Sequence, residues 1–201
     1  MPPTAFAVTW DYRCPFARNL SEHVLVAQAG GAPWDVRFIP FSLDQAHVQE
    51  GEVDVWDDPD QGPRLLALQA GVVVRDRHPA RFPDTHLALF AARHDAGRDI
   101  REEAVVADVL RHQGLDPDEV LGEVAAGWPR ATCRAEHEEA VRQHHVFGVP
   151  TLVAEGQAGF VRVMHRPDGD AAVARQTVDR LLDLVTGWPE LNELKHTTIP
   201  R

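Results

Sequence analysis

The stretch Trp10-Asp-Tyr-Arg-Cys-Pro-Phe-Ala17 joins a predicted strand to a predicted helix. Before it, Ala5-Phe-Ala-Val-Thr-Trp10 is a short run of apolar, β-branched and aromatic residues, which is typical of a buried strand. Pro15 suits the first turn of a helix, where its missing N–H leaves no bond unmade. Apolar residues at helical spacing continue to about Ala29, and Gly30-Gly31 ends the helix. We therefore expect a strand followed directly by an amphipathic helix.

The segments that follow predict a second strand, a loop and a long helical region. Trp34-Asp-Val-Arg-Phe-Ile39 is the second strand, so the first forty residues form a β-α-β unit. Residues 41–62 are polar and acidic and contain Pro59, which indicates a loop. Residues 63–127 carry apolar side chains at helical spacing throughout, and Asp116-Pro117 is a clear helix start inside them. This block separates the β-α-β unit from the rest of the chain.

The last third of the chain predicts a helix, two strands and a final helix. The first helix runs from about Ala131 to His145, and Val149-Pro-Thr-Leu-Val-Ala154 is a strand that opens with proline. A turn over residues 155–159 leads to a strand at Phe160–Met164, and the short spacing favours an antiparallel hairpin. Residues 171–187 form the last helix. The element order, β-α-β, a helical block and α-β-β-α, indicates an α/β fold.

Cys14 is the candidate reactive residue, because it lies where the first strand hands over to the first helix. A thiol at that position faces unsatisfied backbone N–H groups and the positive end of the helix dipole, and both favour the thiolate. The thiolate is the form of cysteine that attacks disulfides and other electrophiles. We therefore expect the pKa of Cys14 to be lowered.

Two motifs give the sequence a resemblance to a known family. Asp11-x-x-Cys14-Pro15-Phe16 resembles the active-site turn of the DsbA-like thioredoxin superfamily, and Phe147-Gly-Val-Pro-Thr151 resembles its Gly-Val-Pro-Thr motif, whose proline is cis. Arg37-Phe-Ile-Pro-Phe-Ser-Leu43 is also similar to a segment found there. The resemblance implies a thioredoxin-like fold, with a core of residues 1–62 and 128–201 and an inserted helical subdomain at 63–127.

The same resemblance implies which residues form the site. Cys14 would be catalytic, and the start of the helix and the surroundings of the thiol would come from Asp11, Tyr12, Pro15, Phe16 and Ala17. Val149, Pro150 and Thr151 would form the surface that binds substrate or cofactor. From the residues themselves, Asp11 is equally suited to tuning the Cys14 proton or to capping the helix. Tyr12 and Phe16 suit either an apolar wall beside the thiol or the core.

The sequence departs from the family pattern at Ala17. Family disulfide oxidoreductases carry Cys-x-x-Cys, and here the fourth position is alanine, so the turn cannot form its own disulfide. A resolving thiol would come from a small thiol such as mycothiol or glutathione, from a partner protein, or from Cys133. The related kappa-class glutathione transferases and chromene-carboxylate isomerases also lack the pair, and they use Ser-Pro at this turn to hold a thiol cofactor.

Three functions are therefore open. The first is a thiol-dependent oxidoreductase that acts through the Cys14 thiolate, with a small thiol or disulfide as substrate and no tightly bound cofactor. The second is an enzyme of the kappa-transferase or isomerase kind, in which Cys14 orients a bound thiol cofactor. The third is a non-catalytic thioredoxin-fold module that binds an extended peptide near Val149.

Composition excludes several other classes of function. The formal net charge of -11 disfavours nucleic acid and anionic membranes as partners, and no apolar run is long enough to span a bilayer. The sequence shows no signal peptide, and its two cysteines cannot form a secreted disulfide framework, so we expect a cytoplasmic protein. No spacing of His, Cys and acidic residues predicts a metal site. A homodimer is compatible with the family, and no motif decides it.

Overall fold

The computed structural model describes residues 2–199. Its sheet has four strands in the order β2-β1-β3-β4. Strands β1 (Ala5–Trp10) and β2 (Asp35–Pro40) are parallel, and their register pairs Ala5 with Asp35. Strand β3 (Thr151–Ala154) runs antiparallel to β1, and β4 (Gln157–Phe160) runs antiparallel to β3. A β-α-β unit and a hairpin thus share one sheet, with β1 and β3 at its centre.

The helices of the described region comprise one long helix after β1, a block between β2 and β3, and one helix after β4. Their bounds are α1 (Pro15–Ala29), α2 (Leu43–Ala46), α3 (Gly62–Arg77), α4 (Phe82–His94), α5 (Glu103–His112), α6 (Pro117–Ala125), α7 (Trp128–His144) and α8 (Ala171–Gly187). Short 3-10 helices, η1 (Pro59–Gln61) and η2 (Pro79–Arg81), precede α3 and α4. In the described part of the chain, no helix is long and apolar enough to cross a membrane.

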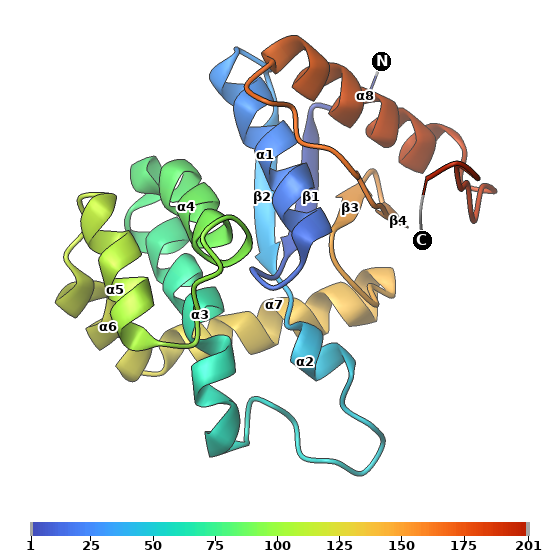
Figure 1. Ribbon diagram of the computed structural model, residues 1–201. Coiled ribbons are helices and arrows are strands. Elements are labelled where there is room, and N and C mark those ends of the chain that lie inside the picture. Colours follow the sequence, from blue (N-terminus) through green and yellow to red (C-terminus); the bar gives the residue numbers. More distant parts are fainter. Residues whose placement is uncertain (1, 200–201) are drawn as a thin grey trace.

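The sheet and the helical block lie beside each other (Figure 1). Helices α1 and α8 pack side by side, and α8 also contacts β3 and β4. Helix α7 packs against β2 and α3, and it crosses near the end of the sheet where β2 finishes (Figure 1). The helices α3–α6 form a block that is joined to the sheet by two helix contacts. Helix α4 packs on α1, and α3 packs on α7. The start of α1 therefore lies at the junction between the block and the sheet.

The predicted α/β thioredoxin-like fold with an inserted helical region is confirmed. The bounds of β1, α1 and α8 agree with those expected from the sequence. The structure gives no separate test of the division into a core of residues 1–62 and 128–201 and a subdomain of residues 63–127. That division stays a prediction.

The predicted strand at Phe160–Met164 is wrong, because the hairpin is tighter than expected. Glu155 and Gly156 both have positive φ, 51° and 77°, so the chain reverses within two residues. Ala154 then pairs with Gln157, and β4 occupies the stretch that the sequence indicated as a turn. After Phe160 the chain leaves the strand.

Two other expected boundaries are also corrected. The predicted loop at 41–62 contains α2, capped by the Ser42 hydroxyl, and η1, capped by the Asp58 carboxylate. Helix α7 begins at Trp128, earlier than the expected Ala131, because Pro129 occupies its first turn instead of ending the preceding helix.

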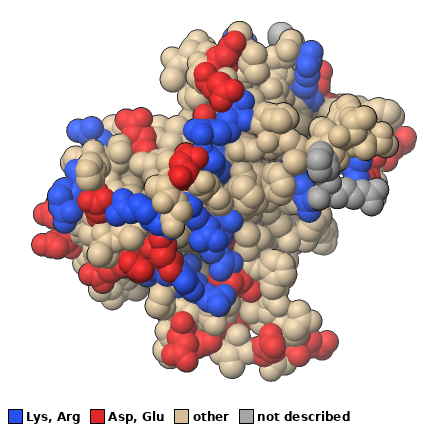
Figure 2. Space-filling model, viewed as in Figure 1, with Lys and Arg blue, Asp and Glu red and all other residues tan. Residues whose placement is uncertain are grey.

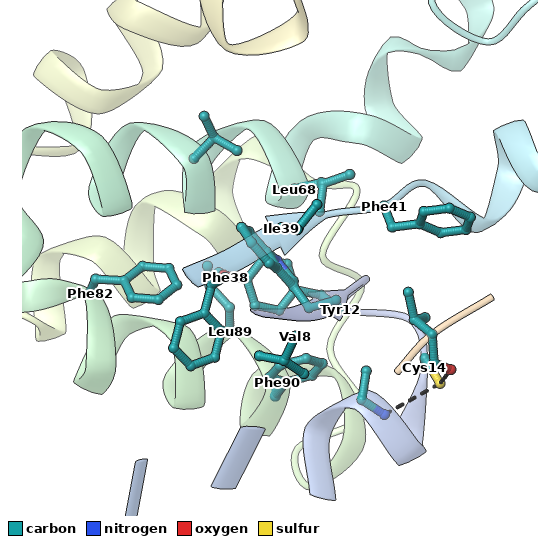
Figure 3. Close-up of a cluster of buried hydrophobic side chains, with 14 of the residues drawn as sticks. Val8, Tyr12, Cys14, Phe38, Ile39, Phe41, Leu68, Phe82, Leu89 and Phe90 are labelled. Atoms are coloured by element: carbon teal, nitrogen blue, oxygen red, sulfur yellow. Dashed lines mark hydrogen bonds between the residues drawn. The ribbon is translucent and has the colours of Figure 1, made fainter. Parts of the chain in front are cut away.

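An aromatic cluster fills the space between β1, β2 and α4. Trp10 and Tyr12 pack edge to face with each other and with the ring of His86, and Phe38 and Phe90 close the cluster. Figure 3 shows Tyr12 directed into these rings, while Cys14 lies apart from them at the start of α1. The turn that carries Cys14 therefore follows directly from residues of the core.

Candidate functional site

The sulfur of Cys14 lies directly before the first residue of α1, with backbone groups on two sides. Cys14 is the N-cap residue, and its Sγ accepts a hydrogen bond from the Ala17 N–H at 3.4 Å. The thiol also donates to the Val149 carbonyl oxygen at 3.2 Å, across 135 residues of sequence. The two motifs that suggested the site therefore meet at this one sulfur atom (Figure 3).

The loop that carries Val149 is fixed by Thr151. The Val149–Pro150 peptide bond is cis. The Thr151 N–H donates to the Thr9 hydroxyl on β1 at 2.9 Å, and the Thr151 hydroxyl donates to the Gly148 carbonyl at 2.8 Å. Thr151 is buried. It therefore holds the loop on β1 and presents the Val149 carbonyl to Cys14, and it offers little surface for a ligand.

Asp11 connects the turn that carries Cys14 to the segment after β2 by hydrogen bonds. Its carboxylate accepts hydrogen bonds from the Arg13 N–H and the Leu43 N–H, both at 2.9 Å. Its own carbonyl accepts from the Cys14 N–H at 3.0 Å. Burial raises the pKa of Asp11, against the lowering effect of the Arg13 charge and the two N–H groups. Asp11 thus shapes the turn that carries the thiol.

The pKa of Cys14 is raised, and the sequence-based expectation of a lowered value is wrong. Burial is the largest cause, because the loop at Val149 covers the sulfur. The backbone N–H groups of Ala17 and Phe16 and the charge of Arg162 lower the pKa, but they do not outweigh burial. At neutral pH the resting form is therefore the protonated thiol.

Tyr12 belongs to the core. Its side chain is 1% exposed, and its hydroxyl lies 2.9 Å from Nδ1 of His86, whose Nε2 is 3.2 Å from the Ser21 hydroxyl. A Cβ at Gly71 would come within 2.5 Å of the Tyr12 hydroxyl, so only glycine fits against it. Tyr12 therefore anchors the turn in the core, and its side chain does not line the surroundings of the Cys14 thiol.

Phe16 lies in a surface cluster that sequence reasoning missed. The guanidinium of Arg162 lies over the rings of Phe16 and Phe160, at 5.4 Å from each centroid. Phe147 packs on Phe160 at 5.2 Å and is 71% exposed. Arg162 follows β4 within the stretch Phe160–Met164 that the sequence indicated as a strand, and no motif there linked it to the thiol. The cluster gives the thiol an aromatic and cationic neighbourhood.

Cys133 is remote from solvent. It lies inside α7 and is completely buried, and burial raises its pKa far above the ordinary value. No disulfide joins it to Cys14, since both cysteines are free. Ala17, the position where the family pattern places a second cysteine, is also completely buried. Among residues 2–199, no group of three or more His, Cys, Asp or Glu side chains is placed to hold a metal ion.

No curated protein sequence matches the chain. Among the solved structures that match its fold are the following three. DsbA of Pseudomonas aeruginosa is 17% identical with a TM-score of 0.55, covering 95% of this chain and 91% of that one. Cytosolic disulfide reductase DsbM of Pseudomonas aeruginosa, solved with GSH, is 15% identical with a TM-score of 0.58, covering 90% and 100%.

The third is a 2-hydroxychromene-2-carboxylate isomerase, 15% identical with a TM-score of 0.59, covering 89% of this chain and 96% of that one. At such low identities these likenesses establish the fold alone. A match to a family model identifies the family. The DSBA-like thioredoxin domain matches residues 8–169, which include both motifs at the Cys14 sulfur, and it indicates an enzyme of the thiol–disulfide oxidoreductase class. The chain belongs to the DSBA-like thioredoxin domain family.

Proposed function

We propose that this chain is a monothiol thiol–disulfide oxidoreductase, in which Cys14 forms a mixed disulfide and an external small thiol releases it. The observation that carries the proposal is the position of the Cys14 sulfur. It lies at a helix start, between the Ala17 N–H and the Val149 carbonyl, in the segment matched by the family. A substrate sulfur that displaces the Val149 carbonyl from the thiol would meet Cys14 directly.

The second cysteine of a dithiol mechanism has no counterpart near this sulfur. Ala17 occupies the fourth position of the turn, and Cys133 is buried inside α7. Burial also keeps Cys133 protonated, and the protonated thiol does not attack disulfides. Resolution by a thiol from outside the chain is therefore part of the proposal.

The reaction follows thiol–disulfide exchange in two steps. The Cys14 thiol loses its proton to solvent, and the thiolate attacks one sulfur of a disulfide RS–SR′. The Cys14–S–S–R bond forms, the RS–SR′ bond breaks, and R′S⁻ leaves and takes up a proton. The thiolate of a small thiol R″SH then attacks the R sulfur, which gives RS–SR″ and returns Cys14. Overall, RS–SR′ and R″SH become R′SH and RS–SR″.

The raised pKa of Cys14 has consequences for both steps. The thiolate fraction at neutral pH is small, so the first step accelerates as the pH rises toward the raised pKa. A thiol with a raised pKa is also a poor leaving group, which slows release of Cys14 from the mixed disulfide. The adduct should therefore be long-lived enough to isolate.

Glutathione or mycothiol is our proposed small thiol, and the cytoplasm is the proposed compartment. DsbM, which shares the fold, is described as a cytosolic disulfide reductase and was solved with GSH. A reducing compartment supplies the thiol that a monothiol enzyme needs for turnover.

The mass of the intact protein after incubation with oxidised glutathione tests the proposal. We expect one glutathione adduct on the wild type and on Cys133→Ala, and none on Cys14→Ser. Reduced glutathione should then restore the original mass. An adduct on Cys14→Ser, or an unmodified wild type at alkaline pH, would contradict the proposal.

A second candidate is an enzyme of the isomerase or transferase kind. Such an enzyme would bind a thiol cofactor without exchanging the sulfur of Cys14. The protonated Cys14 thiol, which donates to the Val149 carbonyl, favours this candidate, because a hydrogen-bond donor is what orients a bound thiol. Serine can replace such a donor. Glutathione should then bind Cys14→Ser and wild type with similar affinity in titration calorimetry, whereas loss of binding in Cys14→Ser counts against it.

A further inference from the structure

A cleft rich in arginine opens beside the active-site turn. It has a volume of about 710 Å³ and is lined by residues from three places: the turn itself, α3, and the end of α4 with the loop that follows. Arg13 and Pro15, the residues on either side of Cys14, are both in its wall. The cleft and the thiol thus share one turn of the chain.

The positive charge of the cleft exceeds what its acidic neighbours balance. Five of the nineteen arginines of the chain line it: Arg13, Arg64, Arg93, Arg98 and Arg101. Figure 2 shows blue side chains gathered over this part of the surface, although the chain as a whole carries a net charge of -11. Such a local reversal of sign is an electrostatic feature that attracts anions.

Four carboxylates pair with these arginines. Arg13 lies 3.7 Å from Asp11. Asp44 is shared by Arg13 at 2.6 Å and Arg64 at 3.2 Å. Two further ion pairs join Arg98 to Asp108 at 2.8 Å and Arg101 to Asp99 at 2.6 Å.

One guanidinium is left over. Arg93 is half-buried, and its guanidinium makes no hydrogen bond or ion pair with any residue from 2 to 199, although its charge helps to lower the pKa of Asp99. The four carboxylates balance at most four of the five guanidinium charges of the cleft. The cleft therefore holds positive charge and guanidinium N–H donors that no protein carboxylate takes up.

We infer that this cleft binds an oxyanion, a carboxylate or a phosphate, at the end of the substrate remote from its sulfur. Guanidinium groups present paired donors that match the oxygens of carboxylates and phosphates. The inference rests on the proposed function, because the sulfur of the same small thiol or disulfide would meet Cys14. Since Arg13 and Pro15 flank Cys14, one small molecule can span the cleft and the thiol.

The inference separates the two small thiols that the sequence left open. Glutathione carries carboxylates, whereas mycothiol has no charged group besides its thiol. An arginine-lined cleft gains attraction only from the charged one. It therefore assigns an anionic thiol, such as glutathione or a phosphate-bearing thiol, as the co-substrate class.

The test compares rates of adduct formation on Cys14 for three disulfides: oxidised glutathione, its carboxyl ethyl ester, and coenzyme A disulfide. Wild type should react faster with the anionic disulfides, and added salt should reduce that advantage. In Arg93→Gln the rate with an anionic disulfide should fall about three- to tenfold, with the ester unaffected. The matched control Arg175→Gln changes an arginine on α8, remote from the cleft, and should leave every rate unchanged.

A fall with glutathione alone identifies a carboxylate, and one with coenzyme A disulfide alone identifies a phosphate. An equal fall with the ester, or no fall with either anion, overturns the inference. Binding of S-methylglutathione and of coenzyme A to Cys14→Ser separates this from the exchange chemistry, since it needs no reactive thiol. If either ligand binds more weakly to Cys14→Ser/Arg93→Gln than to Cys14→Ser, the anion-binding role of the cleft is supported, even if Cys14 forms no adduct. If Arg93→Gln leaves the binding of both ligands unchanged, the anion-binding role of the cleft is rejected, even if Cys14 forms an adduct.

Discussion

The two cysteines of the chain occupy opposite kinds of environment. Cys14 caps α1, and its sulfur contacts backbone groups of two separate segments. Cys133 lies in the middle of α7, completely buried. Burial raises the pKa of both thiols. Backbone N–H groups and Arg162 oppose it at Cys14, whereas at Cys133 the opposing group is the charge of Arg75. The difference shows that placement relative to a helix start and to the Val149 loop, more than residue type, decides which thiol can react.

The largest expected effect is on the rate of alkylation. In the native protein, iodoacetamide should modify Cys14, whereas Cys133 should react at least about a thousandfold more slowly because it needs global opening. In denaturant both thiols should react alike. Peptide mapping of each cysteine at increasing times measures the two rates. Comparable native rates would break the distinction between the two environments.

Serine substitutions should separate the roles of the two thiols in stability. Cys133→Ser buries a hydroxyl in the core and should lower the free energy of unfolding by about 1–3 kcal/mol. Cys14→Ser should cost less than about 1 kcal/mol, because serine is a favourable N-cap and can keep both backbone bonds. Urea unfolding of both variants, with Cys133→Ala as the control without a hydroxyl, gives the values. The reverse order would contradict the packing described here.

A buried imidazole extends the comparison to acid. Burial lowers the pKa of His86 to about 3, so the folded protein keeps it neutral. In the unfolded chain this histidine takes up a proton as the pH falls below about 6.5, whereas in the folded protein it stays neutral. The free energy of unfolding is therefore unaffected by this site above that pH, and it decreases as the pH falls toward 3. At pH 5 this one site should cost about 2 kcal/mol relative to neutral pH.

The variant His86→Gln should lack that acid-dependent loss, although its stability at neutral pH should be lower because its core contacts change. The free energy of unfolding at pH 7.5 and pH 5 measures the difference for each protein. The control His196→Gln replaces an exposed histidine near the end of the chain and should behave as wild type. An unchanged pH dependence in His86→Gln would show that His86 is not the group responsible.

The smallest expected effect sharpens the account of the Cys14 pKa. The charge of Arg162 lowers that pKa, so Arg162→Gln should move the pH midpoint of Cys14 alkylation upward. Arg180→Gln, on α8, is the matched control and should leave it in place. A downward shift in Arg162→Gln would mean that Arg162 acts through packing on Phe16 and Phe160 and that its charge has no net effect.

Sequence could pick out the two segments that meet at the Cys14 sulfur because their motifs are local signals. Cys14 before Pro15 marks a helix start, and Pro150 marks the opening of a predicted strand at Val149–Ala154, which the structure begins at Thr151, so each was visible in a few residues. Family resemblance then brought them together, and the structure shows the Cys14 thiol donating to the Val149 carbonyl. The fold class was predictable for the same reason, since β1, α1 and α8 have clear periodicity.

Other features depend on long-range packing, and sequence could not supply them. The pKa of Cys14 rises because a loop 135 residues away covers the sulfur. Tyr12 turns inward because Gly71 and His86 leave room and a partner for its hydroxyl. The arginine cleft combines Arg13 with residues from α3 and from the end of α4, which no local pattern relates.

The central claim is that Cys14 depends on an outside thiol, and its isolated glutathione adduct tests that claim most directly. The adduct is freed of small thiols, and its mass is followed with and without reduced glutathione. We predict that it persists without added thiol and is released with it, while the matched variant Ala17→Cys releases glutathione unaided. Unaided release from wild type, with formation of a Cys14–Cys133 disulfide, would contradict the account.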